Sequence, residues 1–141
     1  MGYGNRTGGE YYAKAARLKP LTNSKQDEIR VWVSFLGNVR GTVVTNDTYT
    51  KYKNRGASHL KVVSADNSKA AELILKYLPM LAENAKYSYI CDTGIHGGAF
   101  YHIEGRYNGK EFSTQASWPE SCSSPRFDQI NEFLRAVDGP L

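Results

Sequence analysis

The dipeptide Asn108-Gly109 is the feature that most restricts how this chain can fold. Asparagine followed by glycine favours a two-residue type I′ turn between antiparallel strands. The flanking segments 99–107 (AFYHIEGRY) and 110–118 (KEFSTQASW) have the length and residue types of strands. Such a turn fixes the register, so that facing residue numbers sum to 217 and Arg106 faces Glu111. The sequence therefore predicts a β-hairpin over 99–118.

Further strands are predicted from alternation and from runs of β-branched residues. In 28–36 (EIRVWVSFL) every second residue is apolar, which indicates one buried and one solvated face. The apolar set is Ile29, Val31, Val33 and Phe35, and the solvated set is Arg30, Trp32 and Ser34. Segments 42–45, 59–64 and 87–91 are also predicted as strands, whereas 46–57 is predicted to be a polar loop.

Two main helices are predicted. Residues 70–81 repeat apolar side chains at three- and four-residue steps, with Asp66 as the expected N-cap and Pro79 as a kink or early end. The second helix begins after Ser124 with Pro125 in its first position, and Gly139 and Pro140 end it. Its apolar stripe is Phe127, Ile130, Phe133, Leu134 and Val137. A short helix or tail over 10–19 ends at Pro20.

The order β-β-β-α-β-β-β-α predicts an α+β fold in which an antiparallel sheet packs against two main helices. With 141 residues, the chain suits a docking or flexible segment at 1–20 and one domain over 21–141. It holds no apolar run of membrane-spanning length and no apolar block in its first 20 residues. We therefore expect a cytoplasmic protein without a membrane partner. Cys91 and Cys122 are expected as thiols, although their pairing stays open.

Basic residues are concentrated in the first part of the chain. Residues 1–56 hold ten Lys or Arg against four Asp or Glu, whereas 57–141 hold eight against ten. The balance is therefore +6 in the first part and −2 in the second. Such asymmetry is typical of proteins that bind a polyanion or a negative patch on another protein.

One group of residues has the composition of a metal or acid–base site. His102 and Glu104 alternate onto one strand face, and His96 and Asp92 come just before it, so a metal-dependent hydrolase at His96/His102/Glu104 is a third hypothesis. The His-x-Glu spacing also occurs in zinc deaminases, but the second cysteine of that signature is missing after Pro119. A solvent-exposed strand face explains these residues better. We therefore predict no metal, no cofactor and no catalytic residue, and lean towards a protein that is not an enzyme.

Tyrosines and cations cluster in two segments, and these supply the predicted binding residues. Tyr and Arg are favoured anchors at protein interfaces, and Tyr with Lys or Arg also suits stacking on unpaired bases beside phosphates. The predicted contacts are Tyr11, Tyr12, Lys14, Arg17, Tyr49, Lys51, Tyr52, Lys53 and Arg55. Ten tyrosines in the chain exceed what a core needs, which favours recognition over catalysis.

These observations predict a small non-enzymatic binding protein that occupies a macromolecular surface, as an inhibitor, an immunity protein or a phage-encoded antagonist of a host does. A protein partner is the first expectation. The alternative is a single-stranded nucleic-acid-binding protein that uses the same basic, Tyr-rich surface. Where the cations fall after folding should discriminate, because one continuous stripe favours nucleic acid and scattered charges favour a protein. The oligomeric state is left open.

Overall fold

A computed structural model describes residues 26–35, 38–55, 61–90, 100–117 and 125–138. These residues form a six-stranded sheet with the order β4-β3-β2-β1-β5-β6, in which every neighbouring pair is antiparallel. The strands are β1 (Glu28–Phe35), β2 (Asn38–Thr45), β3 (Tyr49–Arg55), β4 (Lys61–Ala65), β5 (Phe100–Tyr107) and β6 (Lys110–Ser117). The helices are α2 (Ala70–Asn84) and α3 (Asp128–Asp138). The predicted α+β fold with an antiparallel sheet and two main helices is confirmed.

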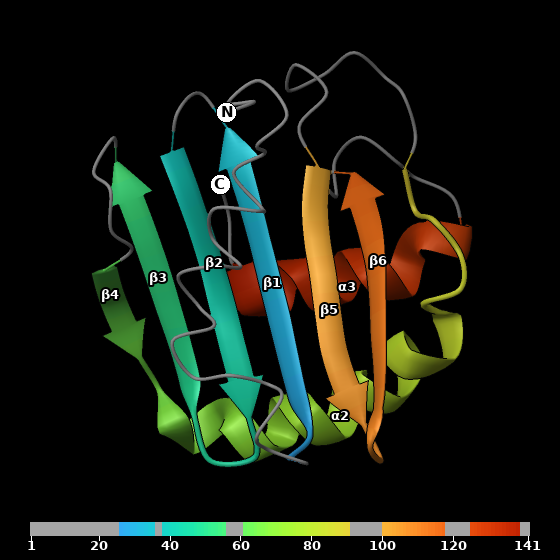
Figure 1. The fold of residues 1–141 in the computed structure, drawn as a ribbon, viewed down its shortest axis with the longest axis horizontal. Coiled ribbons are helices and arrows are strands. Elements are labelled where there is room, and N and C mark those ends of the chain that lie inside the picture. Colours follow the sequence, from blue (N-terminus) through green and yellow to red (C-terminus); the bar gives the residue numbers. More distant parts are fainter. Residues whose placement is uncertain (1–25, 36–37, 56–60, 91–99, 118–124, 139–141) are drawn as a thin grey trace.

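Both helices cover the same face of the sheet (Figure 1), which we call the helix-side face. Between them and the sheet lies a core to which β1 contributes Ile29, Val31 and Val33. From α2 come Ala70, Leu73, Ile74, Tyr77, Leu78 and Leu81, and from α3 come Ile130, Phe133, Leu134 and Val137. These are the stripes that the three- and four-residue spacing predicted. The opposite side of the sheet, which neither α2 nor α3 covers, is called the open face below.

The β5–β6 hairpin was the most accurately predicted part of the fold. Asn108 and Gly109 have φ angles of 52° and 83°, as both central positions of a type I′ turn require. Arg106 faces Glu111, and His102 faces Gln115, so the paired numbers sum to 217 as expected. Arg106 Nη2 lies 3.7 Å from Glu111 Oε2. The turn dipeptide alone was therefore enough to set the pairing of two strands.

The element order differs from the prediction in two places. Tyr49–Arg55 is strand β3 rather than a polar loop, because it pairs with β2 and β4 on its two sides. Segment 87–91 is not a strand, since within its described part only Tyr89 forms an isolated parallel bridge, to Ala116. The observed order is thus β-β-β-β-α-β-β-α.

The structure also differs from two local predictions about α2. Asp66 does not cap α2, because its carboxylate accepts a hydrogen bond from Ser68 Oγ at 2.5 Å and a 3-10 turn, Asn67–Lys69, precedes the helix. Pro79 does not end α2 early. Proline has no N–H to donate to the carbonyl of Leu75, but Pro79 and Leu75 are both exposed, so water can hydrogen-bond to that carbonyl instead. The expected cap at Ser124, the stop at Gly139 and Pro140 and the helix over 10–19 lie outside the described residues.

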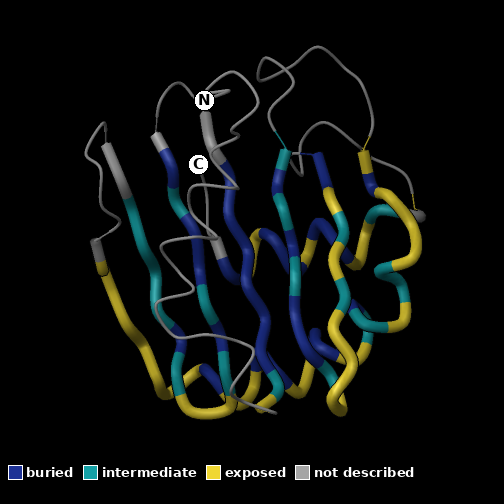
Figure 2. Tube along the Cα trace, viewed as in Figure 1, coloured by how far each residue is buried: buried dark blue, intermediate teal, exposed yellow. Residues whose placement is uncertain are grey.

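β1 is buried on both faces, whereas alternation predicted one solvated face. Arg30 is 1% exposed and Trp32 is 6% exposed, although both alternate onto the open face. Figure 2 shows the described part of β1 as buried. Alternation reports only which residues share a face, and it assigns the polar face to solvent by default. A central strand of a sheet can be covered on both sides, and Arg30 carries its charge inside because Glu28 pairs with it.

None of the helices among the described residues is long and apolar enough to cross a membrane.

Candidate binding surface

The predicted binding residues that the structure describes all lie in β3. Side chains alternate along a strand, so positions 49, 51, 53 and 55 share one face and position 52 lies on the other. The first set lies on the helix-side face, because Thr42 in the neighbouring β2 pairs with Lys51 and donates to Val137 O in α3 at 3.4 Å. Tyr11, Tyr12, Lys14 and Arg17 lie outside the described residues. The structure therefore divides the predicted tyrosine–cation cluster between two faces.

Tyr49 belongs to the core rather than to an accessible surface. Its side chain is 7% exposed, and its hydroxyl donates to Val137 O in α3 at 2.8 Å. Its backbone N–H donates to Asn67 Oδ1 at 3.2 Å, which ties β3 to the turn before α2. The polar composition of 46–57 gave no sign of this role. Tyr49 attaches the C-terminal end of α3 to the sheet.

The cations of β3 belong to a row that crosses three strands. Arg40 in β2 pairs directly with Lys53 in β3, and Lys53 pairs directly with Lys61 in β4. Neighbouring strands lie about 4.8 Å apart, so three basic positions follow one another across the helix-side face. Lys51 and Arg55 flank Lys53 at the next positions along the same face. We call Arg40, Lys51, Lys53, Arg55 and Lys61 the cationic patch.

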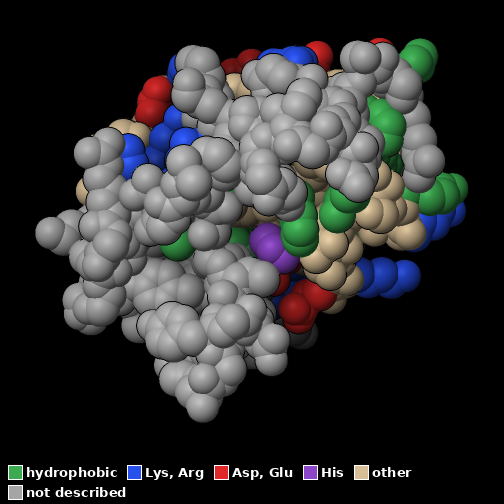
Figure 3. Space-filling view, turned by 90° about the horizontal axis from the view of Figure 1, so that it is seen from above, with side chains coloured by type: hydrophobic (Ala, Val, Ile, Leu, Met, Phe, Trp, Pro, Cys, Tyr) green, Lys and Arg blue, Asp and Glu red, His purple; other side chains and the backbone are tan. Residues whose placement is uncertain are grey.

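The cationic patch has no acidic counterpart in its own strands. Strands β2, β3 and β4 contain these five basic residues and neither Asp nor Glu. Lys51 Nζ lies 5.8 Å from the centre of the Tyr49 ring, and Arg40 Nη2 lies 3.5 Å from Tyr101 Oη. Figure 3 shows Lys and Arg side chains on the β3–β4 side of the molecule, and further ones on the opposite side. Arg40 and Lys61 were missed from the sequence because only the strand register brings them beside Lys53.

β4 lies at one edge of the sheet and is the most exposed strand (Figures 1 and 2). Its side chains from Val62 to Ala65 are all exposed, with Val62 at 59% and Val63 at 56%. Val62 pairs with Tyr52 on the open face, and the ladder shifts by one residue at Val63. Val62 and Val63 are thus exposed at the edge of the sheet, and Val62 lies on the face opposite to the cationic patch.

On the open face, β1 and β5 carry a compact network of opposite charges. Glu28 pairs in register with Arg106, and Arg30 pairs in register with Glu104, so acid and base alternate in both directions. Glu28 also forms an ion pair with Arg30 along β1. Glu28, Arg30 and Arg106 are all buried. In contrast to the cationic patch, this region is internally neutralised, and we interpret it as structural.

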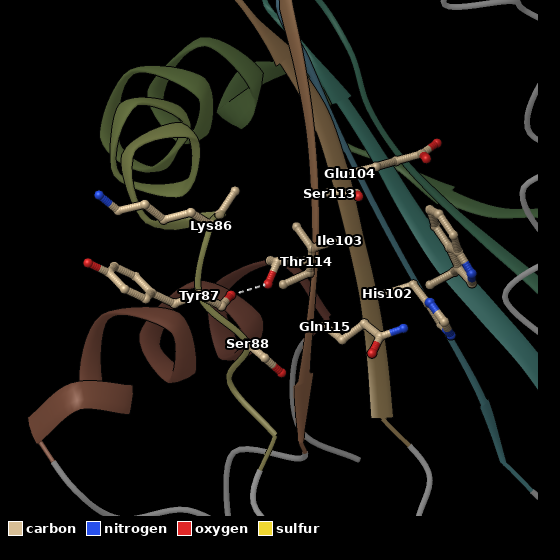
Figure 4. Close-up of a pocket in the computed structure, with 11 residues that line it drawn as sticks. Lys86, Tyr87, Ser88, His102, Ile103, Glu104, Ser113, Thr114 and Gln115 are labelled. Carbon is tan, nitrogen blue, oxygen red and sulfur yellow. Dashed lines mark hydrogen bonds between the residues drawn. The ribbon is translucent and has the colours of Figure 1, made fainter.

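His102 lies beside that network, between two aromatic rings. Its ring stacks on Trp32 at a centroid distance of 5.5 Å and an interplanar angle of 7°, and Phe100 lies at 5.1 Å. A hollow of about 350 Å³ lies here, lined by residues that include His102, Glu104 and Gln115. Figure 4 shows that Lys86, Tyr87 and Ser88 approach from the other side of β6, where Thr114 Oγ1 donates to Tyr87 O. Residues from both faces of the sheet edge thus line the hollow.

The described residues do not form the metal-dependent hydrolase site that was considered from the sequence. His102 and Glu104 share the open face as expected, but His96, Asp92, Cys91 and Cys122 lie outside the described residues. In the part of the chain that the structure describes, no three His, Cys, Asp or Glu side chains come together as metal ligands would. The described residues therefore carry no argument for metal chemistry.

Protonation of His102 should make the stability of the fold depend on pH. Burial lowers the pKa of His102 below its ordinary value of 6.5. When the pH falls below about 6.5, His102 binds a proton in the unfolded chain but not in the folded chain. The free energy of unfolding should therefore fall as the pH drops from about 6.5 towards the pKa of His102 in the folded chain. Urea unfolding at about pH 7.5 and pH 5 should show a smaller difference in His102→Gln than in the parent. Equal pH dependence of the two proteins would contradict the prediction.

No protein-family model, curated protein or solved structure matches this chain.

Proposed function

We propose that this chain is a non-enzymatic binding protein that occupies an acidic surface of another protein through its cationic patch. The observation that carries the proposal is the in-register row Arg40–Lys53–Lys61. Like charges directly opposite one another on neighbouring strands destabilise a sheet. Lys53 lies between two further basic positions in this row, and these strands contain no acidic residue, so an acidic partner would supply the opposite charge that the strands lack.

The charges of Lys51 and Lys53 are available for a partner. Neither Lys51 nor Lys53 forms an ion pair within the described part of the chain, and both side chains are partly exposed. Paired charges elsewhere behave differently, since Glu28 neutralises Arg30 and Glu111 lies beside Arg106. Electrostatic attraction of this kind raises association rates and favours partners of opposite charge. An inhibitor or immunity protein that covers an acidic active site or groove would act in this way.

A protein partner accounts for the surface better than single-stranded nucleic acid does. Binding of unpaired bases uses accessible aromatic rings beside the cations. Here Tyr49 is buried, and Tyr52 lies on the opposite face from Lys51 and Lys53. Val62 pairs with Tyr52 on that opposite face, so the exposed apolar area of β4 adjoins the cations only around the sheet edge, where a protein partner can contact both. By the arrangement of charge alone, a continuous row of cations favours nucleic acid, and nucleic acid is therefore the second candidate. The described aromatic rings of β3 are not accessible beside these cations, and this places it second.

A charge-reversal experiment tests the proposal. The variant Lys51→Glu/Lys53→Glu changes the patch, and Lys69→Glu/Lys110→Glu makes the same charge change at exposed positions elsewhere. We expect the parent and the control to retain the same acidic protein from a lysate of the native host at about 50 mM salt, and the patch variant to lose it. Loss of no protein, or equal loss from both variants, would contradict the proposal. Binding of single-stranded DNA or RNA with a steep salt dependence would establish the second candidate instead.

A further inference from the structure

The open edge of β4 offers a place for an additional strand. Within the described residues β4 pairs only with β3, so the other side of its backbone is not used by the sheet. Side chains on both faces of β4 are exposed, including Val62 and Val63. Exposed sheet edges can bind extended peptides through main-chain hydrogen bonds, with side chains giving specificity.

Several features of this edge disfavour a second copy of the chain. β4 is only five residues long, its ladder with β3 is irregular at Val63, and it begins with a lysine. Short length, bulges and lysines are the devices that protect natural edges against self-pairing. A second copy would also bring another set of five basic residues towards the first. Charge therefore selects against self-association while leaving the edge open to a strand of opposite sign.

The register specifies the side chains that an added strand should carry. Lys51 and Lys53 lie on the helix-side face one strand away from the open edge, so an Asp or Glu on the same face of an added strand would bring a complementary charge towards them. Val62 and Tyr52 pair on the open face, so the next residue of the added strand should be apolar. The period of a strand is two residues, and the preferred sequence therefore alternates acidic and apolar side chains.

We infer that β4 binds an extended segment of the partner, with alternating acidic and apolar residues, as a seventh strand of the sheet. This inference depends on the proposed function, because it specifies how the acidic partner is held. It also explains why Val62 lies on one face of this edge while Lys51 and Lys53 lie on the other, since each would contact one face of the same bound strand.

Peptide binding followed by amide hydrogen exchange tests the inference. The probe is the capped peptide Glu-Val-Glu-Val-Glu-Val, and its controls are the Lys-Val version and a Glu-Val version with N-methylated backbone nitrogens. At about 2 mM, the first peptide should slow exchange of the amides of residues 62–65 by about tenfold, while the Lys-Val and N-methylated peptides should not. The Lys51→Glu/Lys53→Glu variant should lose this protection, and Lys69→Glu/Lys110→Glu should keep it.

Three outcomes would overturn strand addition. The first is absence of protection at β4 with the Glu-Val peptide. The second is equal binding by the N-methylated peptide, which would show that side chains alone make the contact. The third is protection without peptide together with a dimer in sedimentation, which would make a second copy the occupant. None of these affects loss of the host protein from the charge-reversal variant, so failure here is distinguishable from failure of the proposed function.

Discussion

Alanine in place of Gly105 should lower the free energy of unfolding by about 3 kcal/mol, or prevent folding. Gly105 is buried in the middle of β5, where an added Cβ would lie 2.5 Å from Glu28 O and 2.6 Å from Phe112 Cζ. The Phe112 ring could rotate away, but Glu28 O belongs to the backbone of β1. The contact can be relieved only by separating β1 from β5 at the centre of the sheet. Urea unfolding followed by circular dichroism would measure the loss.

Gly109 provides the matched control. It also lies in the hairpin, but an added Cβ would meet nothing within 4 Å. Its φ of 83° costs an L-residue about 1 kcal/mol, so Gly109→Ala should be clearly milder than Gly105→Ala. Equal losses of unfolding free energy in the two variants would mean that steric contacts of the added Cβ are not what destabilises Gly105→Ala. Adding Phe112→Ala to Gly105→Ala should recover little, because the backbone contact with Glu28 remains.

The hairpin shows how much of this fold local sequence could predict. Asn108-Gly109 restricts its own backbone so strongly that turn type and register followed from two residues. The stripes of α2 and α3 were equally legible, because a helix repeats its buried positions over many residues. Such information is contained within one segment and does not depend on its neighbours.

β3 shows what local sequence could not predict. Tyr49–Arg55 alternates Tyr, Lys and Thr with few apolar residues, and it becomes a strand only because β2 and β4 pair with it. Once this strand is missed, Arg40 and Lys61 cannot be placed beside Lys53. The predicted surface therefore contained Lys51, Lys53 and Arg55 but lacked the residues that complete the patch. It also included Tyr49, whose burial depends on contact with α3, far away in the sequence.

Arg30→Met should be as damaging as the change at Gly105, with a loss of about 4 kcal/mol in the free energy of unfolding. Arg30 is 1% exposed, pairs with Glu28 along β1 and faces Glu104 on the neighbouring strand β5. Methionine keeps most of the apolar stem but leaves two neighbouring carboxylates without the cation between them. Buried charges that lose their partner cost far more than the intact pair contributes.

The triple variant Arg30→Met/Glu28→Gln/Glu104→Gln separates the charge from the packing. If unpaired carboxylates cause the loss, removing them together with Arg30 should recover most of the stability, since a neutral set can replace a buried ion network at little cost. Glu111→Gln is the control, because its carboxylate is largely exposed beside Arg106 and its loss should change stability by less than about 1 kcal/mol. A triple variant no more stable than Arg30→Met would show that the arginine acts through its packing instead. In either case the cationic patch on the other face keeps its charges, so binding of the partner should survive in every variant that folds.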